Sequence, residues 1–367
     1  MRALEPGVEG EARAAAQPGH LVSLDVPSGL CSDTGRPLGG GAAHAVLTLC
    51  VGLLKQGLLL DPARSHVGHL ERIDLGLAPH QLRDLPPAQP LRIGPVDLPS
   101  LPVPALSVTA MKYERGRTLI VAGSDRYPGA AALALRGALA SGCGSVQAVL
   151  PQVLEAGLWQ VMPEVVCVER SEALRLERVD SVLFGPGLGR DPALWDQWSG
   201  SLQRFDGLLV IDADGLNLLA SVPDSLTWLL ERSGPTWLTP HRAEFQRLFG
   251  DVGGDSLKDA VSAARSCGCT ILLKGAHSVV AGFGAGPLLL TGTCHSAART
   301  GFGDLLAGFA TGWGGMVRAA GGSATSEMLA AAALLHAVSA CRSGSSSANA
   351  IAECLEELAL QCQKNQS

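Results

Sequence analysis

Residues 118–125 read TLIVAGSD, a short apolar run that ends in a glycine and two polar residues. Because apolar residues follow one another rather than alternate, the run is typical of a strand buried on both faces of a parallel sheet. Similar runs recur at residues 146–150, 181–184, 208–211, 236–238 and 270–273. Helical patterns separate them, and the alternation predicts an α/β domain whose mostly parallel sheet is flanked by helices.

The helices are expected between and after these strands. They are predicted at residues 129–141, 193–203, 243–249, 256–267, 304–313, 326–341 and 349–362. Residues 278–281 and 287–290 predict a hairpin, because the segment between them is rich in glycine.

A proline-rich stretch divides the chain. Residues 86–104 contain seven prolines, and proline fixes φ and lacks the N–H that helices and central strands need. We therefore expect a semi-rigid connector over residues 86–109. It separates a small N-terminal part, residues 1–85, from the α/β domain of residues 110–367.

Composition excludes several classes of protein. The chain is 47% hydrophobic and 17% charged, which predicts a globular fold, and its net charge of −6 argues against a nucleic-acid binder. The ten cysteines include no CxxC pair, so a zinc ribbon is not expected. Residues 1–17 lack the apolar core of a signal peptide, and residues 328–340 are too few to span a bilayer. We expect a soluble cytoplasmic protein with no membrane partner.

Glycine, carboxylate, histidine and lysine residues follow five of the predicted strands. The segments are Gly123–Asp125, Gly185–Gly189, Asp212–Asp214, Thr239–His241 and Lys274–Ala276. Since the carboxyl ends of parallel strands share one edge, the pattern predicts a functional cleft there. Lys274 suits a nucleotide phosphate, although a strand-end lysine can also reach solvent. His241 could contact substrate or be structural, and we expect only one of Asp212 and Asp214 to face the cleft.

The segment Thr300–Asp304, TGFGD, precedes a long apolar helix. Glycines at a helix start leave backbone N–H groups open to an anion, which the helix dipole also favours. Asp304 is either the N-cap of the helix or a general base that accepts a proton while a substrate hydroxyl attacks phosphorus. The sequence has no GxxxxGK[ST] motif and no GxGxxG after the first strand, so residues 301–304 are the predicted phosphate site.

Together these segments resemble the nucleotide-dependent NAD(P)H-hydrate dehydratases of the ribokinase-like superfamily. The matching positions are Lys112, Gly116-Arg117, Val121–Ser124, Gly129-Ala130, Gly185–Gly189, Asp212–Asn217, Thr239–His241 with Glu244, Lys274–Ala276 and Gly301–Asp304. The resemblance covers roughly residues 110–362. Phe302 departs from the family, which usually has threonine between the two glycines.

The resemblance implies a ribokinase-like fold and a metabolite-repair reaction. A hydro-lyase of this kind phosphorylates the ring hydroxyl of (S)-NAD(P)H hydrate with ADP or ATP, phosphate leaves, and NAD(P)H returns. Asp304 is implied as the base. Substrate contacts are implied at Ala130, Gly187, Gly189, His241 and Asp304, and nucleotide contacts at Lys274, Gly275, Ala276, His277, Ser278 and Gly303. Mg²⁺ is expected with the nucleotide, and family members often form homo-oligomers.

Residues 1–85 resemble the second half of an NAD(P)H-hydrate epimerase, a partial Rossmann-like α/β domain. The resemblance rests on Ser23–Gly29, SLDVPSG, together with Asp33–Gly35 and Ile73–Gly76. It implies that Asp25 contacts substrate and that Ser28 helps to hold K⁺. The family's earlier Asn-Gly-Gly-Asp-Gly loop is not in the chain, so we expect no epimerase activity.

Two other functions use the same glycine-Asp turn. A ribokinase-like kinase of a small alcohol would release a stable phosphorylated alcohol instead of NAD(P)H. A nucleotide-binding protein without turnover is the other alternative, and Phe302 and the incomplete N-terminal part are the features that favour it.

Overall fold

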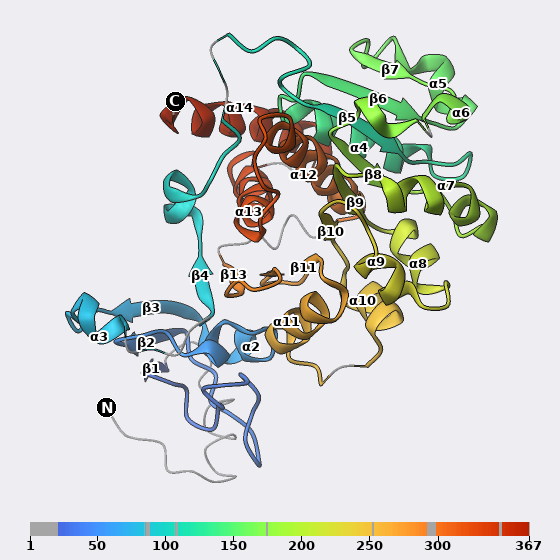
Figure 1. Cartoon of the computed structure of the whole chain (residues 1–367). Helices are drawn as coiled ribbons and strands as arrows, with labels where there is room; N and C mark the ends of the chain where they lie inside the picture. The colour runs from blue at the N-terminus through green and yellow to red at the C-terminus, as the bar shows by residue number, and fades with distance from the viewer. Residues whose placement is uncertain are drawn as a thin grey trace. The chain divides into compact units, whose positions relative to one another are not determined.

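The computed structural model describes residues 21–83, 85, 89–105, 107, 109–173, 175–251, 253–291, 299–344 and 347–366. The chain forms two compact units, Met1–Pro90 and Leu91–Ser367 (Figure 1). No helix in these described ranges is both long and apolar enough to cross a membrane.

The larger unit is built on a ten-stranded sheet in the order β4-β13-β12-β11-β10-β9-β8-β5-β6-β7. The strands are β4 (Leu91–Ile93), β5 (Arg117–Val121), β6 (Ser145–Val149), β7 (Val165–Cys167), β8 (Ser181–Phe184), β9 (Leu208–Ile211), β10 (Thr236–Leu238), β11 (Thr270–Leu273), β12 (Val279–Ala281) and β13 (Leu288–Leu290). Only β12 runs antiparallel to its neighbours, β11 and β13. Every residue of β8 and β9 is buried, as expected for strands covered on both faces. The predicted mostly parallel sheet and its hairpin are confirmed.

Helices cover both faces of this sheet. They are α4 (Pro128–Ala140), α5 (Gln152–Leu158), α6 (Arg170–Ala173), α7 (Pro192–Arg204), α8 (Asp214–Ala220), α9 (Ser225–Leu230), α10 (Arg242–Phe249), α11 (Ser256–Cys267), α12 (Phe302–Ala319), α13 (Ser326–Arg342) and α14 (Ala348–Gln366). Figure 1 shows α12, α13 and α14 on one side of the sheet and α7 to α11 on the other. The long helix α12 packs on α4 and on the central strands β5, β8 and β9.

Helices α12 and α4 touch backbone to backbone. A Cβ added at Gly308 of α12 would overlap the carbonyl oxygen of Ala134, and one at Gly137 of α4 would overlap that of Leu305. Glycine at both positions lets the two helix axes approach more closely than any side chain would permit. This contact fixes the start of α12 relative to the start of α4.

The proline-rich stretch differs from the prediction. Leu91–Ile93 forms β4, which pairs in parallel with β13 at the edge of the large sheet, and a 3-10 helix follows at Pro95–Ser100. The prolines flank β4 and do not interrupt it, and Pro95 stands at the first position of the short 3-10 helix, which also contains Pro99. The predicted connector of residues 86–109 therefore does not hold for residues 91–100, which belong to the larger unit.

The smaller unit has a three-stranded parallel sheet. Its strands are β1 (Val22–Leu24), β2 (Leu47–Val51) and β3 (His69–Ile73), in the order β1-β2-β3. Short helices accompany them: 3-10 helices at Gln56–Leu59 and Asp61–Ala63, α2 (Arg64–Val67) and α3 (Pro79–Arg83). A small apolar cluster that includes Leu30, Cys50 and Leu58 forms its core.

We expect Gly308→Ala to destabilise the larger unit by about 1–3 kcal/mol, the usual cost of overpacking a rigid contact. Gly157→Ala is the matched control, because Gly157 lies in the exposed helix α5 with no atom within 4 Å of an added Cβ. There alanine should be neutral or stabilising. Urea denaturation of both variants measures the difference, and equal midpoints would contradict the backbone contact.

Candidate functional site

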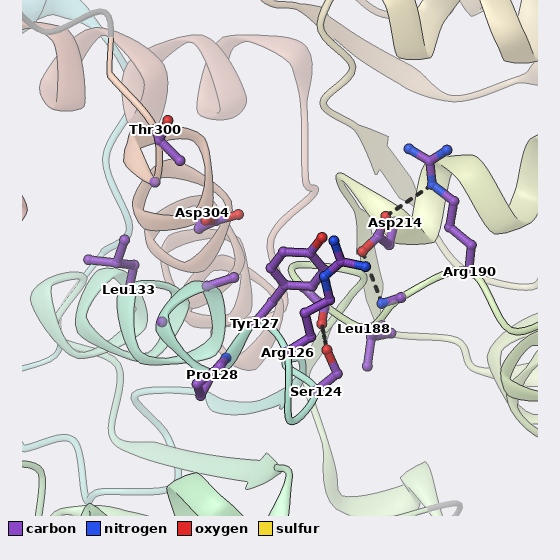
Figure 2. A pocket seen from close by; sticks show the side chains of 15 residues that line it. Ser124, Arg126, Tyr127, Pro128, Leu133, Leu188, Arg190, Asp214, Thr300 and Asp304 are labelled. Atoms are coloured by element: carbon purple, nitrogen blue, oxygen red, sulfur yellow. Dashed lines mark hydrogen bonds and ion pairs between the residues drawn. The ribbon is translucent and has the colours of Figure 1, made fainter.

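A cavity of about 870 Å³ opens at the carboxyl ends of β5, β8 and β9. Its lining comes from the turn after β5, the start of α4, the loop after β8, the start of α8 and the turn into α12 (Figure 2). The lining residues are Ser124, Arg126, Tyr127, Pro128, Gly129, Ala130, Leu133, Gly187, Leu188, Gly189, Arg190, Asp214, Thr300, Gly301 and Asp304. Ala130, Gly187, Gly189 and Asp304, four of the five predicted substrate contacts, are among them.

The glycine loop after β8 lies directly against the start of α4. Gly187 has φ +65°, and a Cβ there would lie 2.7 Å from the Ala130 Cβ and 2.8 Å from the Tyr127 carbonyl oxygen. The Ser124 hydroxyl donates a hydrogen bond of 2.8 Å to the Gly187 carbonyl. These contacts explain why the loop needs glycine and why this wall of the cavity is largely backbone.

Asp304 lies in the first turn of α12, beyond the N-cap residue Gly301. The N-cap alternative for Asp304 is therefore wrong. Burial raises the pKa of the Asp304 carboxyl to about 7, and the neighbouring Asp212 also raises it, whereas Lys274 lowers it. Because an effective general base has a pKa near the working pH, this carboxyl suits proton transfer at neutral pH.

Lys274 forms an ion pair with Asp212. Its Nζ is 2.7 Å from Asp212 Oδ1, and the Asp212 side chain is only 1% exposed. Burial alone would lower the pKa of Lys274, but Asp212, Glu244 and Asp304 outweigh burial and raise it, so the ammonium stays charged. A Cβ added at Gly303 would lie 3.4 Å from this Nζ. The ammonium therefore stands at the N-terminus of α12. The positive charge of Lys274 and the N-terminal end of the helix dipole both attract an anion there.

The other predicted nucleotide contacts lie beside Lys274. Gly275, Ala276, His277 and Ser278 form the turn between β11 and β12. Within this turn the Gly275 N–H donates a 3.3 Å hydrogen bond to the Ser278 hydroxyl. None of these four residues lines the described cavity. Asp304 thus lines the cavity with three other members of the predicted substrate set and also interacts electrostatically with Lys274, the first residue of the predicted nucleotide set.

His241 has a structural role. It is the N-cap of α10, and its Nδ1 accepts hydrogen bonds from the backbone N–H groups of Ala243 and Glu244. Its Nε2 lies 3.2 Å from Glu244 Oε1, and it pairs in a parallel bridge with Lys274. His241 does not line the cavity, so its substrate contact stays a prediction.

Only one of the two aspartates after β9 faces the cavity, as predicted. Asp214 lines the cavity, whereas Asp212 turns inward to Lys274. The chain reverses between them at Ala213, which has φ +50°. The Asp214 carboxylate accepts a 2.9 Å hydrogen bond from the Gly189 N–H and lies 3.5 Å from Arg190 Nε.

Phe302 points away from the cavity. Its ring is 6% exposed and packs with Leu305, Ala340, Ile351 and Ala352. It also meets the His336 ring edge to face, with 6.5 Å between centroids. The unusual residue between the two glycines therefore fills the core behind the turn and leaves the front of the turn open.

Among the cavity residues that the sequence analysis did not single out, Arg126, Tyr127 and Arg190 carry polar side-chain groups. Each lies beside a segment that the sequence did single out, Gly123–Asp125 for the first two and Gly185–Gly189 for the third. Their position next to a glycine turn at a strand end was the sequence signal that could have identified them as cavity residues. Residues 292–298, which precede the turn Thr300–Asp304, lie outside the described residues.

In the smaller unit, Asp25 accepts hydrogen bonds from the Lys55 ammonium and from the Val51 N–H. The hydrogen bond from Lys55 is the main reason that the pKa of Asp25 is lowered. Asp25 also has φ +68°, which is uncommon for a residue other than glycine. Ser28 is exposed, and its carbonyl accepts a hydrogen bond from the Ala43 N–H. The substrate and K⁺ roles of these two residues stay predictions.

The model of the NAD(P)H-hydrate dehydratase family matches residues 118–359. The chain belongs to this family. Bifunctional NAD(P)H-hydrate repair enzymes of Synechocystis and Gloeobacter violaceus are 36% and 37% identical to it, over 78% and 82% of the chain. The chain spans 56% and 61% of the length of these two relatives.

Solved structures share the ribokinase-like fold. A ribokinase-like protein of Enterococcus faecalis matches 76% of this chain and 99% of its own, with a TM-score of 0.64 and 22% identity. The ADP/ATP-dependent NAD(P)H-hydrate dehydratase of Bacillus subtilis, co-crystallised with ATP and Mg²⁺, matches 72% of this chain and 96% of its own. Its TM-score is 0.61 and its identity 25%. The predicted fold class and family are confirmed.

We expect Asp304→Asn to stabilise the protein at alkaline pH. The folded-state pKa of about 7 lies above the ordinary value of 3.8. The acid's contribution to stability is therefore complete below about pH 3.8 and is lost as pH rises through about 7. Thermal unfolding should show the asparagine variant as more stable than wild type at pH 8, by a margin that shrinks towards pH 5. A margin independent of pH would contradict the raised pKa.

Proposed function

We propose that the larger unit catalyses the ADP- or ATP-dependent dehydration of (S)-NAD(P)H hydrate to NAD(P)H. The observation that carries the proposal is the position of Asp304. It lines a cavity of about 870 Å³ and lies in the field of the Lys274 ammonium, whose Nζ is 3.4 Å from a Cβ built on the neighbouring Gly303. A carboxylate in an organic pocket, with a cation and a helix N-terminus nearby, is the arrangement that transfer of a phosphoryl group to an alcohol requires.

In the proposed reaction Asp304 accepts the proton of the ring hydroxyl. The hydroxyl oxygen bonds to the terminal phosphorus of the nucleotide, and the bond from that phosphorus to the bridging oxygen breaks. The phosphorylated ring then loses inorganic phosphate and a proton from the adjacent carbon, which restores the ring double bond. Lys274 and the N–H groups at the start of α12 would stabilise the charge on the transferred group.

Mg²⁺ would accompany the nucleotide. The described residues contain no group of three or more His, Cys, Asp or Glu side chains arranged to hold a metal by themselves. This fits an ion held by phosphates, waters and one or two carboxylates, which is how Mg²⁺ usually binds. Among the carboxylates, Asp212 has the largest effect on the pKa of Asp304. These two carboxylates are therefore the candidates to hold the ion. When bound, the ion would neutralise charge on the phosphates.

The two alternative functions use the same residues. The burial of Phe302 supports turnover over mere nucleotide binding, because the ring does not obstruct the cavity. The kinase alternative differs in its product, a stable phosphorylated alcohol. Assembly into a homo-oligomer and the lack of epimerase activity in the smaller unit stay predictions.

Incubation of (S)-NADH hydrate with ADP or ATP should return NADH and one equivalent of phosphate. Asp304→Asn should lower kcat by roughly a hundredfold or more, the lower range for loss of a general base, and calorimetry should show that it still binds nucleotide. Asp224→Asn is the control, because Asp224 is an exposed helix-capping residue outside the cavity. Accumulation of a phosphorylated hydrate would favour the kinase, and no turnover by wild type would favour the binding protein.

The pH dependence of the reaction follows from Asp304. The base must be ionised, so kcat/KM should fall as pH is lowered through about 7. Lys274 stays charged over this range because its pKa is raised. A steady-state profile from pH 5.5 to 8.5 measures this, and a flat profile would argue against Asp304 as the base.

A further inference from the structure

The cavity contains a cation that the proposed reaction does not use. Four charged side chains line it: Arg126, Arg190, Asp214 and Asp304. Arg190 is paired with Asp214, at 3.5 Å, and Asp304 is only partly ionised near neutral pH because its pKa is about 7. Arg126 is paired with no carboxylate in the described part of the chain. The lining therefore carries an excess of positive charge at Arg126.

Arg126 is held in a defined place. It lies in a turn closed by a 3.0 Å hydrogen bond from the Tyr127 N–H to the Ser124 carbonyl. The Ser124 hydroxyl ties this turn to Gly187. The Arg126 guanidinium lies over the Tyr127 ring, 5.2 Å from its centroid. The Arg126 side chain is exposed at the cavity wall, while its backbone is held by the turn. Such a cation is suited to bind an anion in the cavity.

Arg126 stands apart from the reacting end. In the view of Figure 2, Asp304 is drawn on the side of Thr300 and Leu133, Arg126 on the side of Leu188, Asp214 and Arg190, and the Tyr127 ring between them. A substrate that places its hydroxyl at Asp304 must extend its remaining groups along this cavity. The anions of a dinucleotide are its pyrophosphate and, in NADP(H), the phosphate on the adenosine ribose.

We propose that Arg126 binds a phosphate of the dinucleotide substrate, with Arg190 beside it as a second cation restrained by Asp214. The inference rests on the proposed function. Arginine suits this role because its planar guanidinium donates two parallel hydrogen bonds to phosphate oxygens. Because Arg126 would bind substrate, its loss should raise KM for the hydrate. The chemical step, and therefore kcat, would depend on Asp304.

The test compares Arg126→Gln, Arg126→Lys and the control Arg265→Gln. Arg265 is an exposed arginine of α11, outside the cavity. KM for the hydrate should rise roughly tenfold or more in Arg126→Gln, the effect of losing a charged hydrogen bond, while kcat and KM for ADP stay unchanged. Arg126→Lys should recover part of the loss, and Arg265→Gln should resemble wild type.

The two substrates distinguish the phosphate bound. An equal rise in KM for NADH hydrate and NADPH hydrate assigns Arg126 to the pyrophosphate, and a rise for NADPH hydrate alone assigns it to the ribose phosphate. An unchanged KM for both, or a rise in KM for ADP only, would overturn the proposal. Calorimetry with NADH and NADPH tests the same residue without turnover, so failure of the dehydration reaction and failure of the Arg126 site give different results.

Discussion

The ion pair between Lys274 and Asp212 is the interaction on which the site depends. Asp212 is almost fully buried and holds the ammonium at 2.7 Å. The same carboxylate raises the pKa of Asp304, whereas the ammonium lowers it. Buried ion pairs contribute little net stability, because desolvation opposes the Coulomb attraction. The value of this pair lies in placing a cation near the candidate base Asp304, whose pKa remains close to neutrality.

This electrostatic arrangement needs the close contact of α12 with α4. Gly308 and Gly137 bring the helix backbones together, so the N-terminus of α12 reaches the edge of the cavity formed by α4. The glycine loop after β8 closes the cavity from the other side through Gly187. Backbone thus forms much of the site, and the few side chains that project into it carry the charge.

Much of the fold was predictable because its signals are local. Strands such as Ser181–Phe184 and Leu208–Ile211 are continuous apolar runs, and their limits agree with those of β8 and β9. Strand β4 escaped detection because Leu91–Ile93 is short and surrounded by prolines. Its strand character comes from pairing with β13, nearly 200 residues further along the chain, and no local pattern encodes that partner.

The sequence by itself determined the residue types at the strand ends, and hence the predicted cleft, the candidate base Asp304 and the candidate phosphate-binding turn. Only the tertiary structure decided how these residues divide the work. It turned Asp212 inward and Asp214 outward through the positive φ of Ala213, used His241 as a helix cap, and buried Phe302 behind its turn. It also brought Arg126 to the cavity. Side-chain direction and proximity arise from packing between distant segments, and burial shifts a pKa only once that packing exists.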